Sequence, residues 1–81
     1  MAKIALIGAG GVIFAQNFIK DILISEALRD SEIALMDIDS ARLNNAVIFS
    51  KKIGEKLGVP PKISATTDLR KAVEGSEKNI S

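Results

Sequence analysis

A short glycine-rich segment near the start of the chain has the residue types and spacing to bind phosphate. An apolar run, Lys3–Ile7, leads directly into Gly-Ala-Gly-Gly at residues 8–11, and apolar residues at helical spacing follow. The first glycine allows a sharp strand-to-helix turn, and the second allows backbone N–H groups to approach phosphate oxygens. The N-terminus of the following helix attracts anions through unpaired N–H groups and its dipole. The segment therefore predicts a turn for a dinucleotide pyrophosphate, although Ile13 replaces the third glycine of G-x-G-x-x-G.

Asp37 is the second residue suited to nucleotide binding, because it follows an apolar run of strand length, Glu32–Met36. A carboxylate at this place can accept hydrogen bonds from both ribose hydroxyls and repels a 2′-phosphate, which favours NAD over NADP. Asp37 follows Gly10 by 27 residues, whereas about 20 is usual, because the intervening helix and connection are long. The alternative is that Asp37 only ends the strand, and for Asp39 a helix-capping role is the expected one.

The expected cofactor contacts are Gly8, Gly10, Gly11 and Asp37. The alternative for the glycines is a tight strand-to-helix turn that binds no ligand. Residues 66–68 (Thr-Thr-Asp) lie at the end of a third strand, where ligand-facing loops gather, but we expect them mainly to cap the next helix. Phe14 is expected to pack in the core, with covering a ligand or a partner as the alternative.

The elements that must position these residues alternate between strand and helix. The patterns predict strands at Lys3–Ile7, Glu32–Met36 and Lys62–Thr66, and helices from residue 12 to about Ala27 or Leu28, from Asp39 to Leu57, and over Leu69–Glu74. The fold class is α/β: half of a Rossmann fold, βαβαβα, with a three-stranded parallel sheet in the order 3-2-1 flanked by helices. We expect a truncated dinucleotide-binding domain at residues 1–75, and a tail at 76–81 that is too polar for a buried strand.

The composition argues against several classes of function. A net charge of +1 favours neither nucleic acid nor an anionic membrane, and three Phe are the only aromatic residues. Because the chain lacks Cys and His, it cannot form a disulfide, a thiol nucleophile or a Ser-His-Asp triad. We therefore expect no catalytic residue and no metal ligand. No apolar run reaches the roughly 18 to 20 residues of a membrane span, so a cytoplasmic location is expected.

Three segments resemble glycoside hydrolase family 4, the NAD-dependent α-glucosidases and α-galactosidases. They are residues 3–14 with the glycine turn, residues 33–43 with Asp37, and residues 65–75 with the third strand and short helix. The resemblance implies NAD contacts at the three glycines and Asp37. In intact members it implies Mn²⁺ bound by cysteine and histidine, and hydrolysis through transient oxidation of the sugar, elimination and re-addition of water. Lacking both residue types, this chain alone is expected to be non-catalytic, with at most a weak half-site for NAD.

The family resemblance also implies that the chain is truncated. Members are several times longer and continue after the position of Gly75 with an apolar strand, where this chain has the polar residues 76–81. The strand Lys3–Ile7 would then have an open apolar edge, so we expect a homodimer formed through this edge or through exposed helix faces. Two alternatives stay open: the N-terminal part of a malate- or lactate-type dehydrogenase, and an oligomeric remnant domain without a ligand.

Overall fold

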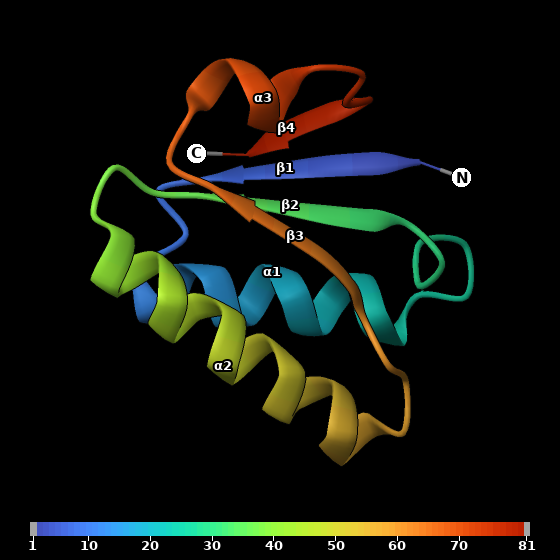
Figure 1. The fold of residues 1–81 in the computed structure, drawn as a ribbon. Helices are drawn as coiled ribbons and strands as arrows, with labels where there is room; N and C mark the ends of the chain where they lie inside the picture. The colour runs from blue at the N-terminus through green and yellow to red at the C-terminus, as the bar shows by residue number, and fades with distance from the viewer. Residues whose placement is uncertain (1, 81) are drawn as a thin grey trace.

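The computed structural model describes residues 2–80, apart from the side chains of residues 12–14. Within this range the chain forms strands β1 (Lys3–Ile7), β2 (Glu32–Met36), β3 (Lys62–Thr66) and β4 (Lys78–Ile80), and helices α1 (Val12–Ile24), α2 (Ser40–Leu57) and α3 (Leu69–Val73). All strand pairs are parallel, in the order β3-β2-β1-β4. Helices α1 and α2 lie on one face of the sheet and α3 on the other (Figure 1). The predicted α/β, Rossmann-like arrangement is confirmed, with four strands instead of three.

The core follows from the alternation of side chains along β1 and β2. Ile4 is paired in register with Ile33, and Leu6 with Leu35, and all four are buried against α1 and α2. The alternate residues of the same strands face the other side, where small side chains allow close packing. Ala5 and Ala34 are fully or almost fully buried there, as is Ala72 of α3. The sheet is therefore covered on both faces, as expected for parallel strands.

Helix α1 is shorter than the sequence pattern predicts. It ends at Ile24, and Ser25 takes an extended conformation with φ −82° and ψ 120°. The predicted last turn instead forms tight turns, in which the N–H groups of Leu28 and Arg29 donate to the Ser25 carbonyl. Ile24 and Leu28 are 55% and 39% exposed, so extending the helix would bury little apolar surface. The spacing of hydrophobic residues alone therefore overestimates the length of this helix.

The prediction that residues 76–81 form only a polar tail is wrong for Lys78–Ile80, which form β4 beside β1. The N–H of Glu77 donates to the Lys3 carbonyl at 2.8 Å and starts the pairing. β4 is an edge strand, so its polar residues Lys78 and Asn79 remain exposed while Ile80 packs against the core. A polar sequence is compatible with an edge strand because the ladder uses backbone groups. The edge of β1 that was expected to be open is thus occupied, and dimer formation remains a prediction.

The C-terminus of α2 has the predicted stop. Gly58 adopts a left-handed conformation with φ 70°, and its N–H donates to the carbonyls of Glu55 and Gly54. The segment after it then packs back onto the helix, because the absent side chain of Gly54 leaves space for Pro61. This return leads the chain into β3 at the sheet edge.

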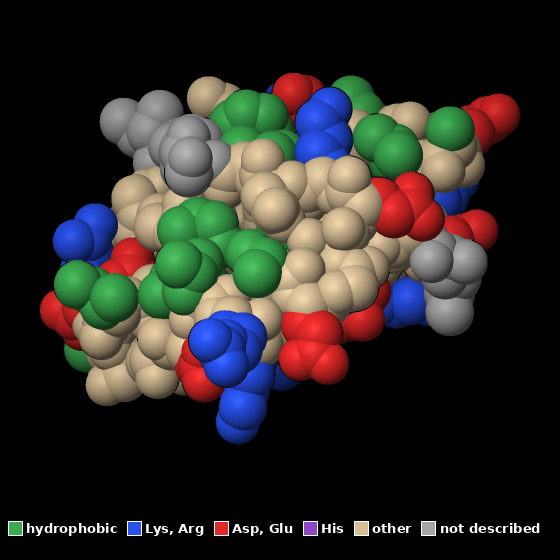
Figure 2. Space-filling view, turned by 90° about the horizontal axis from the view of Figure 1, so that it is seen from above, with side chains coloured by type: hydrophobic (Ala, Val, Ile, Leu, Met, Phe, Trp, Pro, Cys, Tyr) green, Lys and Arg blue, Asp and Glu red, His purple; other side chains and the backbone are tan. Residues whose placement is uncertain are grey.

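The face that carries α3 and β4 has no dominant charge. Acidic and basic side chains alternate there with small groups of hydrophobic ones (Figure 2). Among the described residues, no helix has the length and apolar character needed to cross a membrane.

Candidate functional site at the glycine turn

The β1–α1 turn is held by hydrogen bonds from each of its four backbone N–H groups. Those of Gly8 and Ala9 both donate to the Met36 carbonyl, at 2.8 and 2.9 Å. The Gly11 N–H closes the turn on the Gly8 carbonyl at 3.0 Å, and the Gly10 N–H donates to the Asp37 carboxylate at 2.9 Å. Contacts with the end of β2 therefore hold the turn in this conformation without a ligand.

Asp37 lies at the centre of this arrangement. It is only 5% exposed, and its two oxygens accept from two different loops: Oδ2 from Gly10 and Oδ1 from the N–H of Asp39, each at 2.9 Å. The Asp39 N–H lowers the pKa of the Asp37 carboxyl most, with further lowering by Gly10 and by the guanidinium of Arg42, while burial opposes the shift. Asp37 is thus a stabilised carboxylate at neutral pH.

Position 10 requires glycine because neighbouring side chains of the same chain lie very close to it. A Cβ at this position would lie 2.5 Å from Asp37 Oδ2, 2.6 Å from Arg42 Cβ and 2.9 Å from Arg42 Nε. Real Cβ atoms do not approach so closely, so even alanine would displace Asp37 or Arg42. The sequence argument explained the second glycine by the approach of phosphate; the structure adds the approach of the carboxylate.

The other two glycines differ in what they require. Gly8 has φ +76°, a left-handed conformation that favours glycine whatever space surrounds it. Gly11 has φ −75°, which any residue can adopt, and a Cβ there would make an ordinary contact of 3.5 Å with the Gly8 carbonyl. The structure thus brings Gly8, Gly10, Gly11 and Asp37 together as predicted from the sequence, with a distinct role for each glycine.

The three helices of the described chain begin in different ways. Gly11 caps α1 without a side-chain hydrogen bond, and the first turn contains no acidic residue. Asp39 caps α2 by accepting from the N–H groups of Ala41 and Arg42, and Asp68 caps α3 in the same way with Arg70 and Lys71. The capping roles predicted for Asp39 and Asp68 are confirmed. Only α1 among these helices therefore begins without a carboxylate from the chain.

The site contains two residues that the sequence argument did not single out. Arg42 lies against Gly10 and its charge acts on Asp37. Ile38, next to Asp37, is 86% exposed, so it presents an apolar surface beside the turn. The sequence signal for both was their spacing from Asp37: an apolar residue immediately after it, and a cation in the first turn of the next helix.

Topology places the glycine turn at the expected ligand-binding edge of the sheet. The chain leaves β1 for α1 on one face and reaches β4 through α3 on the other, so the strand order reverses between β1 and β4 (Figure 1). In open α/β sheets, ligands bind outside the carboxyl ends of the strands at such a switch point. The turn at residues 8–11 follows the carboxyl end of β1 and so lies at this point.

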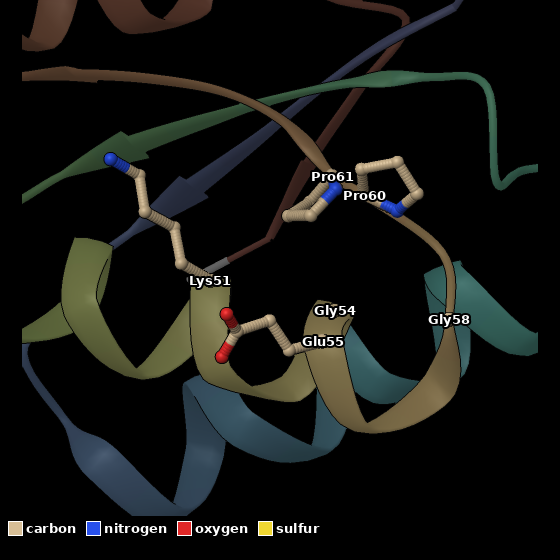
Figure 3. Close-up of a pocket in the computed structure, with 6 residues that line it drawn as sticks. All are labelled: Lys51, Gly54, Glu55, Gly58, Pro60 and Pro61. Carbon is tan, nitrogen blue, oxygen red and sulfur yellow. The ribbon is translucent and has the colours of Figure 1, made fainter.

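A separate hollow of about 440 Å³ lies at the other end of α2. Figure 3 shows the two prolines after the helix lying across from its last turns. One lysine and one glutamate provide its only charged groups, and it is lined by Lys51, Gly54, Glu55, Gly58, Pro60 and Pro61. Since α2 runs from Ser40 beside Asp37 to Leu57, this hollow is separate from the glycine turn.

Two predicted features lie outside the described side chains. The displacement of α1 expected from Ile13 and the packing of Phe14 concern side chains that the structure does not describe. Among the residues that are described, no group of three acidic, histidine or cysteine side chains lies close enough together to bind a metal ion. The candidate site therefore consists of the turn, Asp37 and Arg42.

Comparison with known proteins adds an independent observation. A model of the family described as "Family 4 glycosyl hydrolase" matches residues 3–78. An alpha-galactosidase of Rhizobium meliloti (strain 1021) is 42% identical over 79 residues, which are 98% of this chain and 16% of the relative. An alpha-galactosidase of Bacillus subtilis (strain 168) is 36% identical over 76 residues, 94% of this chain and 18% of the relative.

A third relative has a different substrate name. An alpha-glucosidase of Erwinia rhapontici is 41% identical over 75 residues, which are 93% of this chain and 17% of the relative. The chain thus spans 16–18% of the length of these three relatives. The matched segment includes the glycine turn, Asp37 and the first three strands.

Proposed function

Because this chain belongs to family 4 of the glycosyl hydrolases, we propose that it binds the adenosine diphosphate half of NAD. The observation that carries this proposal is the preformed turn at residues 8–11, joined to a buried carboxylate and followed by a helix without an acidic cap. Pyrophosphate binding then falls to the N-terminus of α1, where the helix dipole and backbone N–H groups favour an anion.

The chemistry of Asp37 fits the ribose of the nucleotide. Each carboxylate oxygen has about two acceptor sites, and each accepts one backbone N–H in this structure. We propose that the remaining acceptor capacity of the carboxylate serves the ribose hydroxyls, at the small part of Asp37 that is exposed. The exposed Ile38 beside it provides an apolar surface suited to a purine ring. When bound, NAD supplies a hydride acceptor, whereas these residues bind and orient its adenosine half.

The Mn²⁺ that the family resemblance implies does not fit this chain. Cysteine and histidine, the expected ligands, are absent from the sequence. These residues therefore support no metal-dependent step.

The activity of a complete family member is a further part of the proposal. Two of the relatives described above are named alpha-galactosidases and one is named alpha-glucosidase. We propose that the intact enzyme acts on an α-glycoside and that this chain alone, without its own catalytic groups, is not active. The family match favours this interpretation over a malate- or lactate-type dehydrogenase.

Titration of the chain with ADP, ADP-ribose and NAD by calorimetry tests the proposal. We expect binding of all three with similar, weak affinity, because the proposed contacts reach only the adenosine diphosphate part that the three ligands share. NADP should bind more weakly than NAD, from which it differs only by a 2′-phosphate that would approach the Asp37 carboxylate. Absence of binding by all of them at millimolar concentration would instead support a domain that has no ligand.

A further inference from the structure

We propose that Asp37 is a positioning residue for the phosphate-binding turn, in addition to its proposed contact with ribose. This inference rests on the proposed function, in which the turn faces a pyrophosphate. Its basis is that the Asp37 carboxylate joins the β1–α1 turn to the β2–α2 loop through one hydrogen bond on each oxygen. Binding of ribose alone does not require a hydrogen bond between this carboxylate and the phosphate-binding turn.

The hydrogen bonds of the turn show why Asp37 matters. Gly8 and Ala9 donate to a backbone carbonyl of β2, and Gly11 donates within the turn. Gly10 donates to a side chain. The orientation of the Ala9–Gly10 peptide group therefore depends on the position and the charge state of the Asp37 carboxylate. Gly11 and the start of α1 follow directly, so this peptide sets the direction from which the helix begins.

The surroundings of Asp37 fix the carboxylate in turn. The Asp39 N–H binds its other oxygen, and Asp39 itself caps α2. The absent Cβ of Gly10 gives the carboxylate the space that it occupies. A continuous set of contacts thus runs from the N-terminus of α2 through Asp37 to the turn before α1. Such preorganisation reduces the ordering cost of binding a ligand.

This role makes a distinctive prediction for a ligand without ribose. If Asp37 only accepts hydrogen bonds from ribose, its removal weakens the binding of ADP. The binding of inorganic pyrophosphate then stays the same or becomes slightly stronger, because a negative charge is lost. If Asp37 positions the turn, its removal weakens both ligands. The two roles therefore differ in the behaviour of pyrophosphate.

The test is titration of the wild-type chain, Asp37→Asn and Asp39→Asn with ADP and with inorganic pyrophosphate. Asp39→Asn is the matched control: it removes the same charge two residues away, and asparagine is as good a helix cap as aspartate. We expect Asp37→Asn to weaken the binding of both ligands about fivefold relative to Asp39→Asn, because the Gly10 N–H then has a neutral amide oxygen in place of a charged acceptor, and hydrogen bonds to charged groups are the stronger ones. Loss of ADP affinity alone would overturn the positioning role.

A second measurement needs no ligand and so separates this inference from the proposed function. In ¹⁵N–¹H spectra, the Gly10 amide proton should shift upfield in Asp37→Asn and remain unchanged in Asp39→Asn, while Gly11 stays nearly constant in both. The wild-type Gly10 resonance should also titrate at a pH below the ordinary aspartate value. A Gly10 resonance that responds neither to Asp37→Asn nor to pH would overturn the inference, even if ADP binds.

Discussion

The N-termini of α1 and α2 lie at the same edge of the sheet, follow neighbouring strands and differ in what occupies their backbone N–H groups. At α2, the Asp39 side chain accepts from two of these groups, at 2.9 and 3.2 Å. At α1, Gly11 takes the cap position without a side-chain hydrogen bond, and no acidic residue follows in the first turn. The two ends have the same backbone chemistry, and only their side chains differ.

This difference separates a structural role from a binding role. A carboxylate cap neutralises the positive end of the helix dipole and stabilises the fold. An uncapped helix gives up that stabilisation and keeps its N–H groups available to an external anion. α3 follows the pattern of α2, since Asp68 caps it. The glycine turn is therefore where we propose an open anion site, and four experiments probe that proposal.

The largest effect is expected from Gly10→Ala, because this substitution disrupts the packing of the turn that precedes the uncapped N-terminus of α1. The added Cβ would overlap Asp37 and Arg42, so we expect a loss of about 2 kcal/mol in the free energy of unfolding. Gly11→Ala is the control, because its Cβ has ordinary space, and we expect it to cost less than about 1 kcal/mol. Urea unfolding followed by circular dichroism suits a chain without Trp or Tyr. Equal losses in both variants would contradict the assigned contacts.

The substitution Gly11→Asp would remove the difference between the two helix N-termini, because it gives α1 the type of cap found at α2. The backbone at residue 11 is extended and accepts a side chain. We expect stability to rise by a few tenths of a kcal/mol, roughly the difference between Asp and Gly caps. We also expect ADP affinity to fall by about tenfold or more, since a carboxylate would occupy the anion site. Gly11→Asn, a cap without charge, should lower affinity less. Unchanged ADP binding in Gly11→Asp would move the anion site elsewhere.

Removing the cap of α2 provides the opposite change. Asp39→Ala deletes the acceptor of two N–H groups, and we expect a loss of about 1 kcal/mol in unfolding free energy. Asp68→Ala makes the same deletion at α3 and should cost less, because this helix has only five residues and a single one of them, Ala72, is buried. Asp39→Asn should retain most of the stability. If Asp39→Ala proved neutral in urea unfolding, the capping bonds would not contribute to stability in solution.

The smallest effect is a stability contribution that is present at neutral pH and is lost in acid. The pKa of Asp37 is lowered in the folded chain, so its contribution to stability is fully present above the ordinary value of about 3.8. That contribution is lost as the pH falls from there through the lowered pKa, because protonation removes the acceptor charge. We expect unfolding free energies of wild type and Asp37→Asn to converge in this range. Parallel curves down to pH 3 would show that Asp37 has no lowered pKa.

Most of the architecture could be predicted from local patterns. The bounds of β1, β2 and β3 match the strands predicted from the sequence, and the caps at Asp39, Asp68 and Gly58 follow residue type. Two predictions failed where tertiary context decides. The last turn of α1 did not form, because its apolar residues find no core to pack against. β4 formed from a polar segment, because an edge strand needs a neighbour with free backbone groups more than it needs apolar side chains.

The sequence by itself determined four residues of the candidate site: the three glycines at positions 8, 10 and 11, and Asp37 after the second strand. It did so because backbone freedom and charge are properties of residue type. Only the tertiary structure decided that Asp37 binds the Gly10 N–H and that Arg42 lies against the same glycine. The hydrogen bond joins residues 27 positions apart in the chain, and both contacts exist because parallel pairing of β1 with β2 brings the two strand ends to the same edge.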